Sequence, residues 1–440
     1  MSSTPATSSA LASAKPAVPA NSAAASVKPA PPSSPPASAA ASPAPGTPIK
    51  VGLLESLTGP IAQGAKDNLD GFNLYLASTN NTIAGRKIQV VVADDQNQAD
   101  VGLTKAKQLV DVDHINVLMG ISPTPLCYAI ASYVQQAHVP TAVSGNCGAD
   151  NATTTPKYKS PYFVRFSQNT SGLFGPAGDW AFKQGYKTAD IVTSDYAGGL
   201  EVTDVTASAF VLAGGSIVQE QHPPLGTTDF GPFLAKLNQN ADALFAFMPG
   251  ADSLRFGQQY ADYVTTEKLH IIDDGAQITA GSTLAQLKDK DVGVVASAIY
   301  TEASDSPQNK AFLQAWAAKY PGRPVSVDAA QGYCGAQILD AALKKVNGDI
   351  ENTQAFLNAL YSTNLETAKG PVKLDQDHDI IQNVYVYQIV KNGNGYGQKL
   401  LQTYKDVARG FERFPGKPTP GALKDKWVGL TKAKLEAMKS

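Results

Sequence analysis

The stretch INVLMGISPTPLCYAIASYVQQAHVPTAVSGNCG, residues 115–148, decides the fold class. Ile115–Met119 is an apolar run typical of a strand that is buried on both faces of a parallel sheet, and Pro140–Val143 is a weaker run of the same kind. The amphipathic run Leu126–Gln136 lies between them and predicts a helix. A strand, a helix and a second strand in this order predict a right-handed βαβ unit.

Small polar residues follow both predicted strands. Gly120–Thr124 comes after the first strand, and Ser144–Gly148 comes after the second. In an open α/β sheet, ligands bind in the crevice outside the carboxyl ends of the strands. The two segments are therefore expected to be neighbouring ligand loops. The alternative, that they are only tight connections, stays open at this point.

The same alternation extends to both sides of this unit. Further strands are expected at Ile49–Leu54, Lys87–Ala93, Asp190–Thr193, Ser216–Gln219, Ala243–Met248, His270–Ile272 and Val292–Ala298. Further helices are expected at Asp67–Ser78, Asp100–Val110, Gly172–Gly185, Glu201–Ala213, Ala251–Thr265 and within the block Ser306–Tyr361. Strands that alternate with helices of about 10–15 residues predict parallel sheets and an α/β fold class.

Two places break the alternation. Between Cys147 and Thr188 a polar loop leads to the short run Tyr162–Ser167, which we interpret as a strand crossing between two lobes. Near the end, Gly370–Leu374 and Val384–Val390 predict a hairpin-like return crossing.

The length and the composition of the chain limit the classes of protein to which it can belong. A chain of 440 residues is too long for one ordinary core, so two domains plus extensions are expected. The net charge of −2 and the lack of a Lys/Arg cluster argue against a nucleic-acid partner. No run approaches the length of about 18 apolar residues that spans a membrane.

The two ends of the chain differ from the middle. Residues 1–48 consist almost wholly of Ala, Ser, Pro and Thr, and such a segment is predicted to be a disordered linker. No apolar core of a signal peptide follows Met1, so an export signal that was removed and one that lies upstream both stay open. Residues 405–440 are predicted to be a C-terminal extension with a final basic helix, Leu423–Lys439.

The three cysteines allow one disulfide bond and one free thiol. Cys127 and Cys147 both follow predicted strand ends, so they are candidates for the bond in an oxidising compartment. Two buried free thiols are the equally weighted alternative. Cys334, inside a helical run, is expected in the core.

Enzyme motifs are missing. The segment GPIAQGAK, residues 59–66, resembles a phosphate-binding loop, but its Lys comes one place too late and Asp67 stands where Ser or Thr would meet magnesium. The sequence has no GxGxxG after its first strand, no HExxH and no GxSxG. Asp94-Asp95 and Asp273-Asp274 are carboxylate pairs that fit acid–base chemistry or a hard metal, or else cap strand ends. We therefore predict a binding protein that is not an enzyme, with no catalytic residues, no cofactor and no metal.

A series of motifs in one order carries a family resemblance. The motifs are IKVGLLESLTGP (49–60), Gly71, VVVADDQNQ (90–98), VLMGISPT (117–124), VPTAVSG (139–145), SDYAGG (194–199), TTDFGPFLAKLNQNADALFAFMPG (227–250) and GPVKLDQDHDIIQNVYVYQIV (370–390). Together they resemble the periplasmic leucine/isoleucine/valine-binding family of ABC-transporter receptors. The resemblance implies a type I periplasmic binding fold, which is two Rossmann-like lobes with parallel sheets joined by a three-segment hinge.

The resemblance also implies domains and a function. Lobe I is expected at residues 49–166 plus 300–371, and lobe II at residues 167–299 plus 372–404. The implied protein is a periplasmic or otherwise extracytoplasmic monomer, free or tethered, that delivers a small solute to the membrane permease of an ABC importer. Branched-chain or other amino acids, amides, and aromatic or other carboxylic acids are the implied ligands. A ligand-sensing regulator on the same fold is the main alternative, and an enzyme is the lesser one.

In lobe I, the resemblance implies a hydroxyl group that binds the ligand carboxylate just after the third strand. Thr124 matches it without a gap, and Ser122 is the near alternative. The helix starting near Leu126 is expected to add backbone N–H groups.

The next loop of the family supplies a carbonyl and a hydroxyl to the ligand. An ungapped match places these on Gly145 and Cys147, and a shift of one residue places them on Asn146 and Gly148.

In lobe II, Tyr196 matches an aromatic residue that covers the ligand, and Asp274 matches an acid that pairs with an α-ammonium group. Gly64 replaces an aromatic residue seen in some members, which is expected to leave room for a larger side group. Phe247–Pro249 is a candidate apolar wall, although the core is the favoured place for Phe247.

Overall fold

The computed structural model describes residues 46–264, 266, 268–393, 395–410 and 421–438. The predicted disordered linker lies outside the described residues except for residues 46–48. Within the described ranges, no helix combines the length and the apolar character needed to cross a bilayer.

Lobe I is built on a sheet with six described strands in the order β2-β3-β1-β4-β5-β6. They are β1 (Ile49–Glu55), β2 (Thr82–Ile83), β3 (Arg86–Asp94), β4 (Val117–Gly120), β5 (Thr141–Val143) and β6 (Phe163–Arg165). Neighbouring strands are parallel except in the β2–β3 hairpin. The βαβ unit predicted from residues 115–148 is therefore present as β4, α3 (Thr124–Ala137) and β5.

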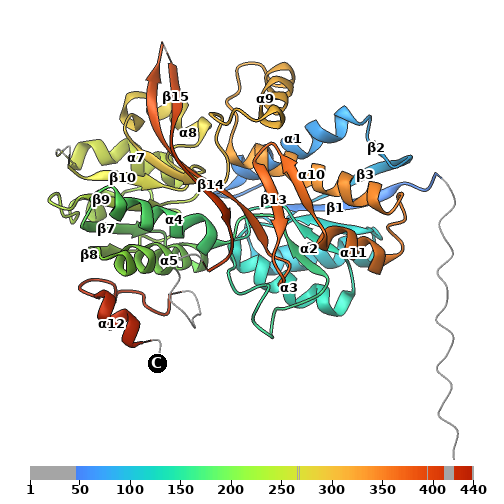
Figure 1. Ribbon diagram of the computed structural model, residues 1–440, viewed down its shortest axis with the longest axis horizontal. Helices are drawn as coiled ribbons and strands as arrows, with labels where there is room; N and C mark the ends of the chain where they lie inside the picture. The colour runs from blue at the N-terminus through green and yellow to red at the C-terminus, as the bar shows by residue number, and fades with distance from the viewer. Residues whose placement is uncertain (1–45, 265, 267, 394, 411–420, 439–440) are drawn as a thin grey trace, which may run out of the picture. The chain divides into compact units, whose positions relative to one another are not determined.

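Helices cover both faces of this sheet (Figure 1). One face packs on α1 (Ala62–Ser78), α10 (Val327–Lys345) and α11 (Thr353–Tyr361), with Phe72 and Leu339 in the core beside Val51. The other face packs on α2 (Ala99–Asp111) and α3, with Ile130 beside Leu118. Apolar residues on both faces of the strands explain the near-continuous hydrophobic runs in the sequence.

Helices α1 and α10 approach each other closely because glycine stands at their contact. A Cβ atom at Gly71 would lie 2.0 Å from the Ala329 carbonyl oxygen, and one at Gly332 would lie 1.9 Å from that of Asn68. The absence of side chains at both positions therefore permits the contact. It joins the middle of α1 to the first two turns of α10.

The second sheet extends from lobe II into lobe I, where Val372 packs in the core. It has nine described strands in the order β12-β13-β14-β11-β10-β9-β7-β8, and β15 pairs with β14. They are β7 (Thr188–Thr193), β8 (Ser216–Gln221), β9 (Ala243–Phe247), β10 (His270–Asp273), β11 (Val295–Ala298), β12 (Asn364–Thr367), β13 (Gly370–Leu374), β14 (Ile380–Asn392) and β15 (Gly395–Val407). Strands β7 to β11 form parallel pairs, and β12 to β15 pair antiparallel.

Helices again lie on both faces. The helices α4 (Thr170–Lys183) and α5 (Ala197–Ala213) cover one face, and the short α6 (Gly231–Leu234), α7 (Ala251–Tyr263) and α8 (Gly281–Leu287) cover the other. A 3₁₀ turn, Lys288–Asp291, leads from α8 toward β11. Two Rossmann-like lobes were predicted, and the two helix-covered sheets confirm them.

Within the described residues, the chain passes between the lobes three times. The first passage follows β6 and enters α4, and the second follows β11 and enters α9 (Pro307–Lys319). The third lies in β14, where Ile380 packs in the core of lobe I and Val386 packs in the core of lobe II. Tyr162–Ser167, predicted as a crossing strand, contains β6, which is the edge strand of the first sheet, and the crossing comes directly after it.

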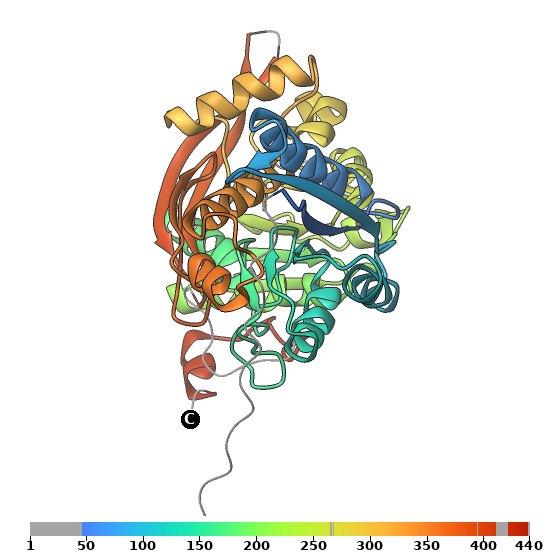
Figure 2. The same ribbon diagram turned by 90° about the vertical axis from the view of Figure 1, so that its right-hand side faces the viewer.

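The C-terminal region differs from the prediction. The strand β15 extends to Val407, so the predicted extension at residue 405 begins inside a strand. The predicted helix Leu423–Lys439 is wrong over its first part, because the described helix α12 covers only Lys432–Ala437. Trp427 is fully buried in the core of lobe II. The helix α12 lies at the lower edge of the molecule in both views (Figures 1 and 2) and contacts α5.

Candidate ligand-binding site

A cavity of about 460 Å³ lies between the lobes, which is a typical size for a small-molecule site. Its walls are the loops after the carboxyl ends of β1, β4 and β5 in lobe I and of β7, β9 and β10 in lobe II. The lobes touch beside it, because the Ala251 N–H donates to the Pro60 carbonyl oxygen at 3.2 Å. The cleft is therefore at the strand ends where the sequence predicted ligand loops.

Thr124 lines the cavity as the first residue of α3. Its side chain has no hydrogen-bond partner among the described residues, so the hydroxyl is available to a ligand. The resemblance implied further N–H donors near Leu126, but the N–H groups of Leu126 and Cys127 donate to the Pro123 carbonyl oxygen at 3.0 and 3.2 Å. These two groups therefore serve the helix start instead of the cavity.

Asn146, Gln168 and Asp328 form a chain of hydrogen bonds on the wall of the cavity. Gln168 Nε2 donates to Asn146 Oδ1 at 3.1 Å, and Asn146 Nδ2 donates to Asp328 Oδ1 at 2.5 Å. The second carboxylate oxygen of Asp328 and the amide oxygen of Gln168 remain as acceptors, and the latter is buried without a partner. Burial raises the pKa of Asp328 to about 6, although the Asn146 bond opposes the rise.

Gly64 makes room for the Asp328 carboxylate. A Cβ atom at position 64 would lie 2.5 Å from Asp328 Oδ2. The prediction that Gly64 leaves space for a larger ligand group needs correction, because the carboxylate already occupies the place beside it. Because position 64 has no side chain, a negatively charged carboxylate can lie in the cavity wall there.

Aromatic rings form the wall in lobe II. Tyr196 and Phe247 are stacked with ring centroids 6.4 Å apart, and Phe174 meets Phe247 edge-on at 5.4 Å. All three line the cavity. Phe247, favoured as a core residue, is 8% exposed and contributes to both the core and the cavity.

Asp274 also lines the cavity from lobe II, directly after β10. It accepts hydrogen bonds from the Ala276 N–H at 3.0 Å and from Gln277 Nε2 at 3.4 Å. Burial, together with the negative charges of Asp273 and Asp328, raises the pKa of Asp274. A cation at this carboxylate would reverse the rise.

Asp273 has a structural role. Its carboxylate accepts hydrogen bonds from the Thr279 N–H and hydroxyl and from the Gly275 N–H. Asp94 acts similarly, since it accepts from the N–H groups of Leu57 and Gln96. Both pairs that had been considered for acid–base chemistry or a metal therefore contain a residue that holds a loop.

The described residues that line the cavity include no Lys, Arg or His. They include three carboxylates, those of Asp67, Asp274 and Asp328. Arg323 forms ion pairs with Asp67 and with Asp70, so the charge of Asp67 is balanced from outside the cavity. Asp274 and Asp328 have no such cation in the described ion pairs, which makes the cavity rich in acceptors.

The residues predicted for the site fall into two groups. Thr124, Asn146, Tyr196 and Asp274 line one cavity. Ser122, Gly145 and Cys147 do not line it.

The reason is that these three residues build the loops behind the wall. The Ser122 hydroxyl accepts from the Asn146 N–H at 2.6 Å, the Gly145 N–H donates to the Gly120 carbonyl oxygen at 2.7 Å, and Cys147 forms a disulfide bond with Cys127. Cys334 is a buried free thiol, as expected.

Several lining residues were not predicted. They include Gln63, Asp67, Asn97, Phe174, Gln168, Gln277 and Asp328. Asp328 follows Ser326, the N-cap of α10, whose side chain accepts from the Ala329 N–H. A polar residue in a first helical turn is common, so only the tertiary contact with α1 shows that Asp328 faces the cleft.

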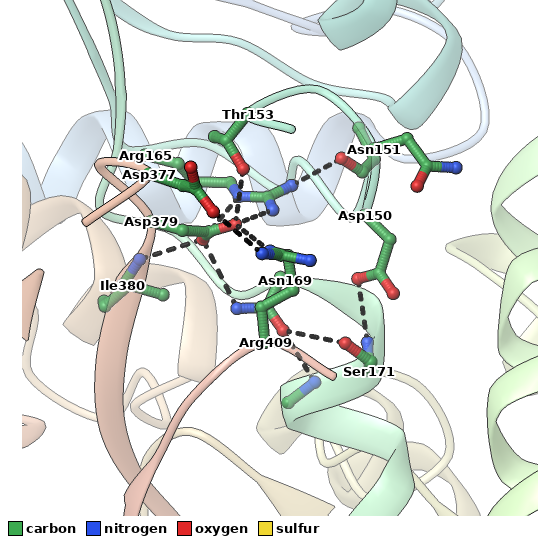
Figure 3. Close-up of polar contacts among 12 residues, drawn as sticks. Asp150, Asn151, Thr153, Arg165, Asn169, Ser171, Asp377, Asp379, Ile380 and Arg409 are labelled. Carbon is green, nitrogen blue, oxygen red and sulfur yellow. Dashed lines mark hydrogen bonds and ion pairs between the residues drawn. The ribbon is translucent and has the colours of Figure 1, made fainter. Parts of the chain in front are cut away.

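A buried polar cluster lies where the first and third passages between the lobes meet (Figure 3). The guanidinium of Arg165 pairs with Asp379, and its Nη1 donates to the Ala149 carbonyl oxygen at 2.8 Å. Asn169 Nδ2 and the Thr153 hydroxyl also donate to Asp379, at 3.3 and 3.0 Å. The cluster therefore joins the loop after β5 to the starts of α4 and β14.

Comparisons with known proteins agree with this architecture. Residues 48–394 match the family of periplasmic binding proteins. The Leu/Ile/Val-binding protein homolog 6 of Brucella melitensis is 30% identical over 366 residues, which cover 81% of this chain and 92% of that protein.

Two solved structures are also similar. An ABC transporter substrate-binding protein from Sphaerobacter thermophilus is 29% identical with a TM-score of 0.77, over 82% of this chain and 99% of that one. A solute binding protein of an ABC transporter from Rhodopseudomonas palustris BisB5, in complex with 3,4-dihydroxy benzoic acid, is 31% identical with a TM-score of 0.76, over 82% and 98%. These matches confirm the family and the fold class predicted from the motifs. The chain belongs to the periplasmic binding protein family and has the type I fold of the solute-binding proteins of ABC transporters.

Proposed function

We propose that this protein is the extracytoplasmic solute-binding protein of an ABC importer and that it captures a small organic solute carrying an amino group. The observation that carries the ligand class is the cavity itself, which offers Asp274 to a cation and includes no Lys, Arg or His among its described lining residues. Thr124, at the start of α3, provides a hydroxyl for the acceptor end of the same ligand. An amino acid carries both an ammonium group for Asp274 and a carboxylate for Thr124.

Closure of the two lobes is the proposed mechanism. A ligand favours the closed form only as far as it binds that form more tightly than the open one. Pairing Asp274 with an ammonium group is strong only when water is excluded, because the low local dielectric strengthens the interaction. The hydrogen bond from the Ala251 N–H to the Pro60 carbonyl oxygen supports such exclusion, since it brings the two lobes together beside the cavity.

An aromatic carboxylic acid is the second candidate ligand. Phe174, Tyr196 and Phe247 line the cavity and offer ring faces and edges to an aromatic group. The similar Rhodopseudomonas palustris protein is in complex with 3,4-dihydroxy benzoic acid. Against this candidate stands the negative charge of the carboxylates, which disfavours a second anion in a closed cavity.

A thermal-shift screen followed by calorimetry separates the two candidates. A ligand that binds only the folded protein raises its melting temperature by mass action. We expect amino acids to give the larger shifts and benzoate or 4-hydroxybenzoate the smaller ones. Small-angle scattering of the protein with its best ligand is expected to show a decrease in the radius of gyration. A shift only with aromatic acids would establish the second candidate, and binding without closure would contradict the mechanism.

The remaining parts of the proposal rest on family membership. They are a membrane permease as partner, a monomeric state, a location outside the cytoplasm, the absence of catalysis, and lobes at residues 49–166 plus 300–371 and 167–299 plus 372–404. A pull-down with membranes distinguishes a permease partner from the regulatory partner of a sensor. Analytical ultracentrifugation tests the monomer, and chromatography of the bound compound after incubation tests for turnover.

A further inference from the structure

Carboxylates from both lobes reach the same cavity. Asp274 comes from the end of β10 in lobe II, and Asp328 comes from the first turn of α10 in lobe I. Both side chains are almost fully buried, with 5% exposure each. The charge of Asp328 acts on Asp274, so the two groups repel each other when both are ionised.

Neighbouring residues fix the position of the Asp328 side chain. Gly64 leaves the space that Oδ2 occupies, and Asn146 holds Oδ1 by a hydrogen bond of 2.5 Å. The amide of Asn146 is oriented in turn by Gln168. These contacts hold a negatively charged group in the wall in place of the aromatic ring or aliphatic chain that an uncharged ligand would favour.

Two acceptor atoms in the cavity wall have no donor among the described residues. Gln168 Oε1 is buried without a partner, and one oxygen of Asp328 has no hydrogen bond among the described residues. A buried acceptor without a donor costs free energy. The bound ligand can supply a donor to the free oxygen of Asp328, which is not among the buried atoms without a partner.

We propose that Asp328 is a second ligand-binding carboxylate and that the solute is a nitrogen cation with a net positive charge, such as a basic amino acid, whose charged nitrogen lies between Asp274 and Asp328. This inference rests on the proposed function and names its substrate class. The cation bridges the lobes, because one carboxylate belongs to each of them. Without it, closure requires Asp274 to take up a proton, because burial and the neighbouring negative charges raise its pKa to about 8, so the ligand's charge couples binding to the closed form.

The charge balance favours a cation over a zwitterion. An aliphatic amino acid brings one ammonium group and one carboxylate, so it leaves the pair of aspartates with an uncompensated negative charge. Lysine or arginine brings one more positive charge, and arginine also offers a planar group with several N–H donors to two carboxylates.

The test is calorimetric titration of the full chain with L-arginine, L-lysine, L-leucine and 4-hydroxybenzoate. We expect arginine or lysine to bind more tightly than leucine. The variant Asp328→Asn has the same shape and can still accept from Asn146, and we expect it to weaken binding of the basic amino acid at least about tenfold. Its affinity for leucine is expected to change little. Asp305→Asn is the matched control, because that side chain is 98% exposed outside the cavity.

A second variant guards against misfolding of the first. Gly64→Ala keeps the charge but places a methyl group against Asp328 Oδ2, so it should also weaken the basic amino acid more than leucine. Circular dichroism checks that both variants are folded. Binding of leucine or 4-hydroxybenzoate without binding of either cation would overturn the inference and leave a solute-binding function standing. Equal affinities of wild type and both variants for the cation would also overturn it. If none of the three amino acids and 4-hydroxybenzoate bound at millimolar concentration, this inference and the proposed amine ligand would both be contradicted.

Discussion

Arg165 and Asp379 form an ion pair in which both side chains are completely buried, and the pair joins the end of β6 to the start of β14. The two residues therefore connect the first and the third passage between the lobes (Figure 3). Removing one partner of a buried pair leaves the other charge uncompensated, which typically costs about 3–5 kcal/mol. We expect Asp379→Asn to lower the free energy of unfolding by about this amount in urea titrations.

The matched control for that variant is Lys159→Ala. Lys159 pairs with Asp377 in the same region, but its side chain is 54% exposed. Such surface pairs contribute about 0–1 kcal/mol. If Asp379→Asn cost no more than Lys159→Ala, the buried pair would not have the structural role inferred for it.

Thr124→Ala is expected to weaken binding of a carboxylate-bearing ligand by about 1–3 kcal/mol, because it removes a charge-assisted hydrogen bond. Calorimetry with the best ligand from the screen measures the change. Thr124→Ser retains the hydroxyl and should retain most of the affinity. Unchanged affinity in the alanine variant would show that the hydroxyl does not contact the ligand.

Asp274→Asn is expected to separate two ligand classes. The amide cannot balance an ammonium group, so amino acids should lose much more affinity than simple carboxylic acids. Titration of the variant with an amino acid and with benzoate gives both values. Equal losses would argue against Asp274 as the partner of a cation.

The disulfide bond between Cys127 and Cys147 closes a loop with a sequence separation of 20. A loop of this size predicts a stabilisation of about 3 kcal/mol through the unfolded state. We expect the double variant Cys127→Ala/Cys147→Ala to melt at a lower temperature by calorimetry. Because Cys147 lies between Asn146 and Gly148 of the cavity wall, the affinity of the double variant for its ligand should decrease as well. A melting temperature equal to that of the oxidised wild type would contradict the stabilising role.

The raised pKa of Asp190 predicts that the free energy of unfolding depends on pH. Burial raises its pKa from the usual 3.8 to about 7, although the Asn238 N–H donates to it. Well below pH 3.8 both the folded and the unfolded chain hold the proton, so the stabilisation is fully present. As the pH rises toward 7, the unfolded chain loses the proton first and the stabilisation decreases by at most about 1.4 kcal/mol per pH unit.

The variant Asp190→Asn removes this titration while it keeps an oxygen for the Asn238 N–H. Urea titrations between pH 4 and 7 should therefore show a shallower decrease in the free energy of unfolding than the wild type shows. Parallel profiles for the two proteins would contradict a raised pKa for Asp190.

The family resemblance names cavity residues that come from strand ends. Thr124, Asn146, Tyr196 and Asp274 each follow a predicted parallel strand and line the cavity, because the carboxyl ends of such strands meet at one edge. Asp328 lies at the start of a helix that follows no strand of its own sheet, so its place depends on the packing of α1 against α10. A contact between residues 64 and 328 depends on the tertiary fold and leaves no local pattern in the sequence.

Strand β15 shows a second limit of the sequence. Its residues alternate poorly, and most of them are exposed or half-buried, since it pairs with β14 on one side only. The apolar alternation that marks a half-buried strand is therefore weak in it. The C-terminal helix was overestimated for the opposite reason, because Leu423 and Trp427 give apolar spacing but pack into lobe II from turns.

The buried place of Trp427 determines where this protein can be shortened. The family match ends at residue 394, between two strands that are hydrogen-bonded along most of their length. A cut there would remove β15, one of the strands that pair with β14, and would leave a cavity against α5 in place of Trp427, whose Nε1 donates to Asp204. Residues 395–407 and the segment around Trp427 are thus part of the cooperative folding unit. A fragment that ends at the family boundary would lack residues of its own hydrophobic core.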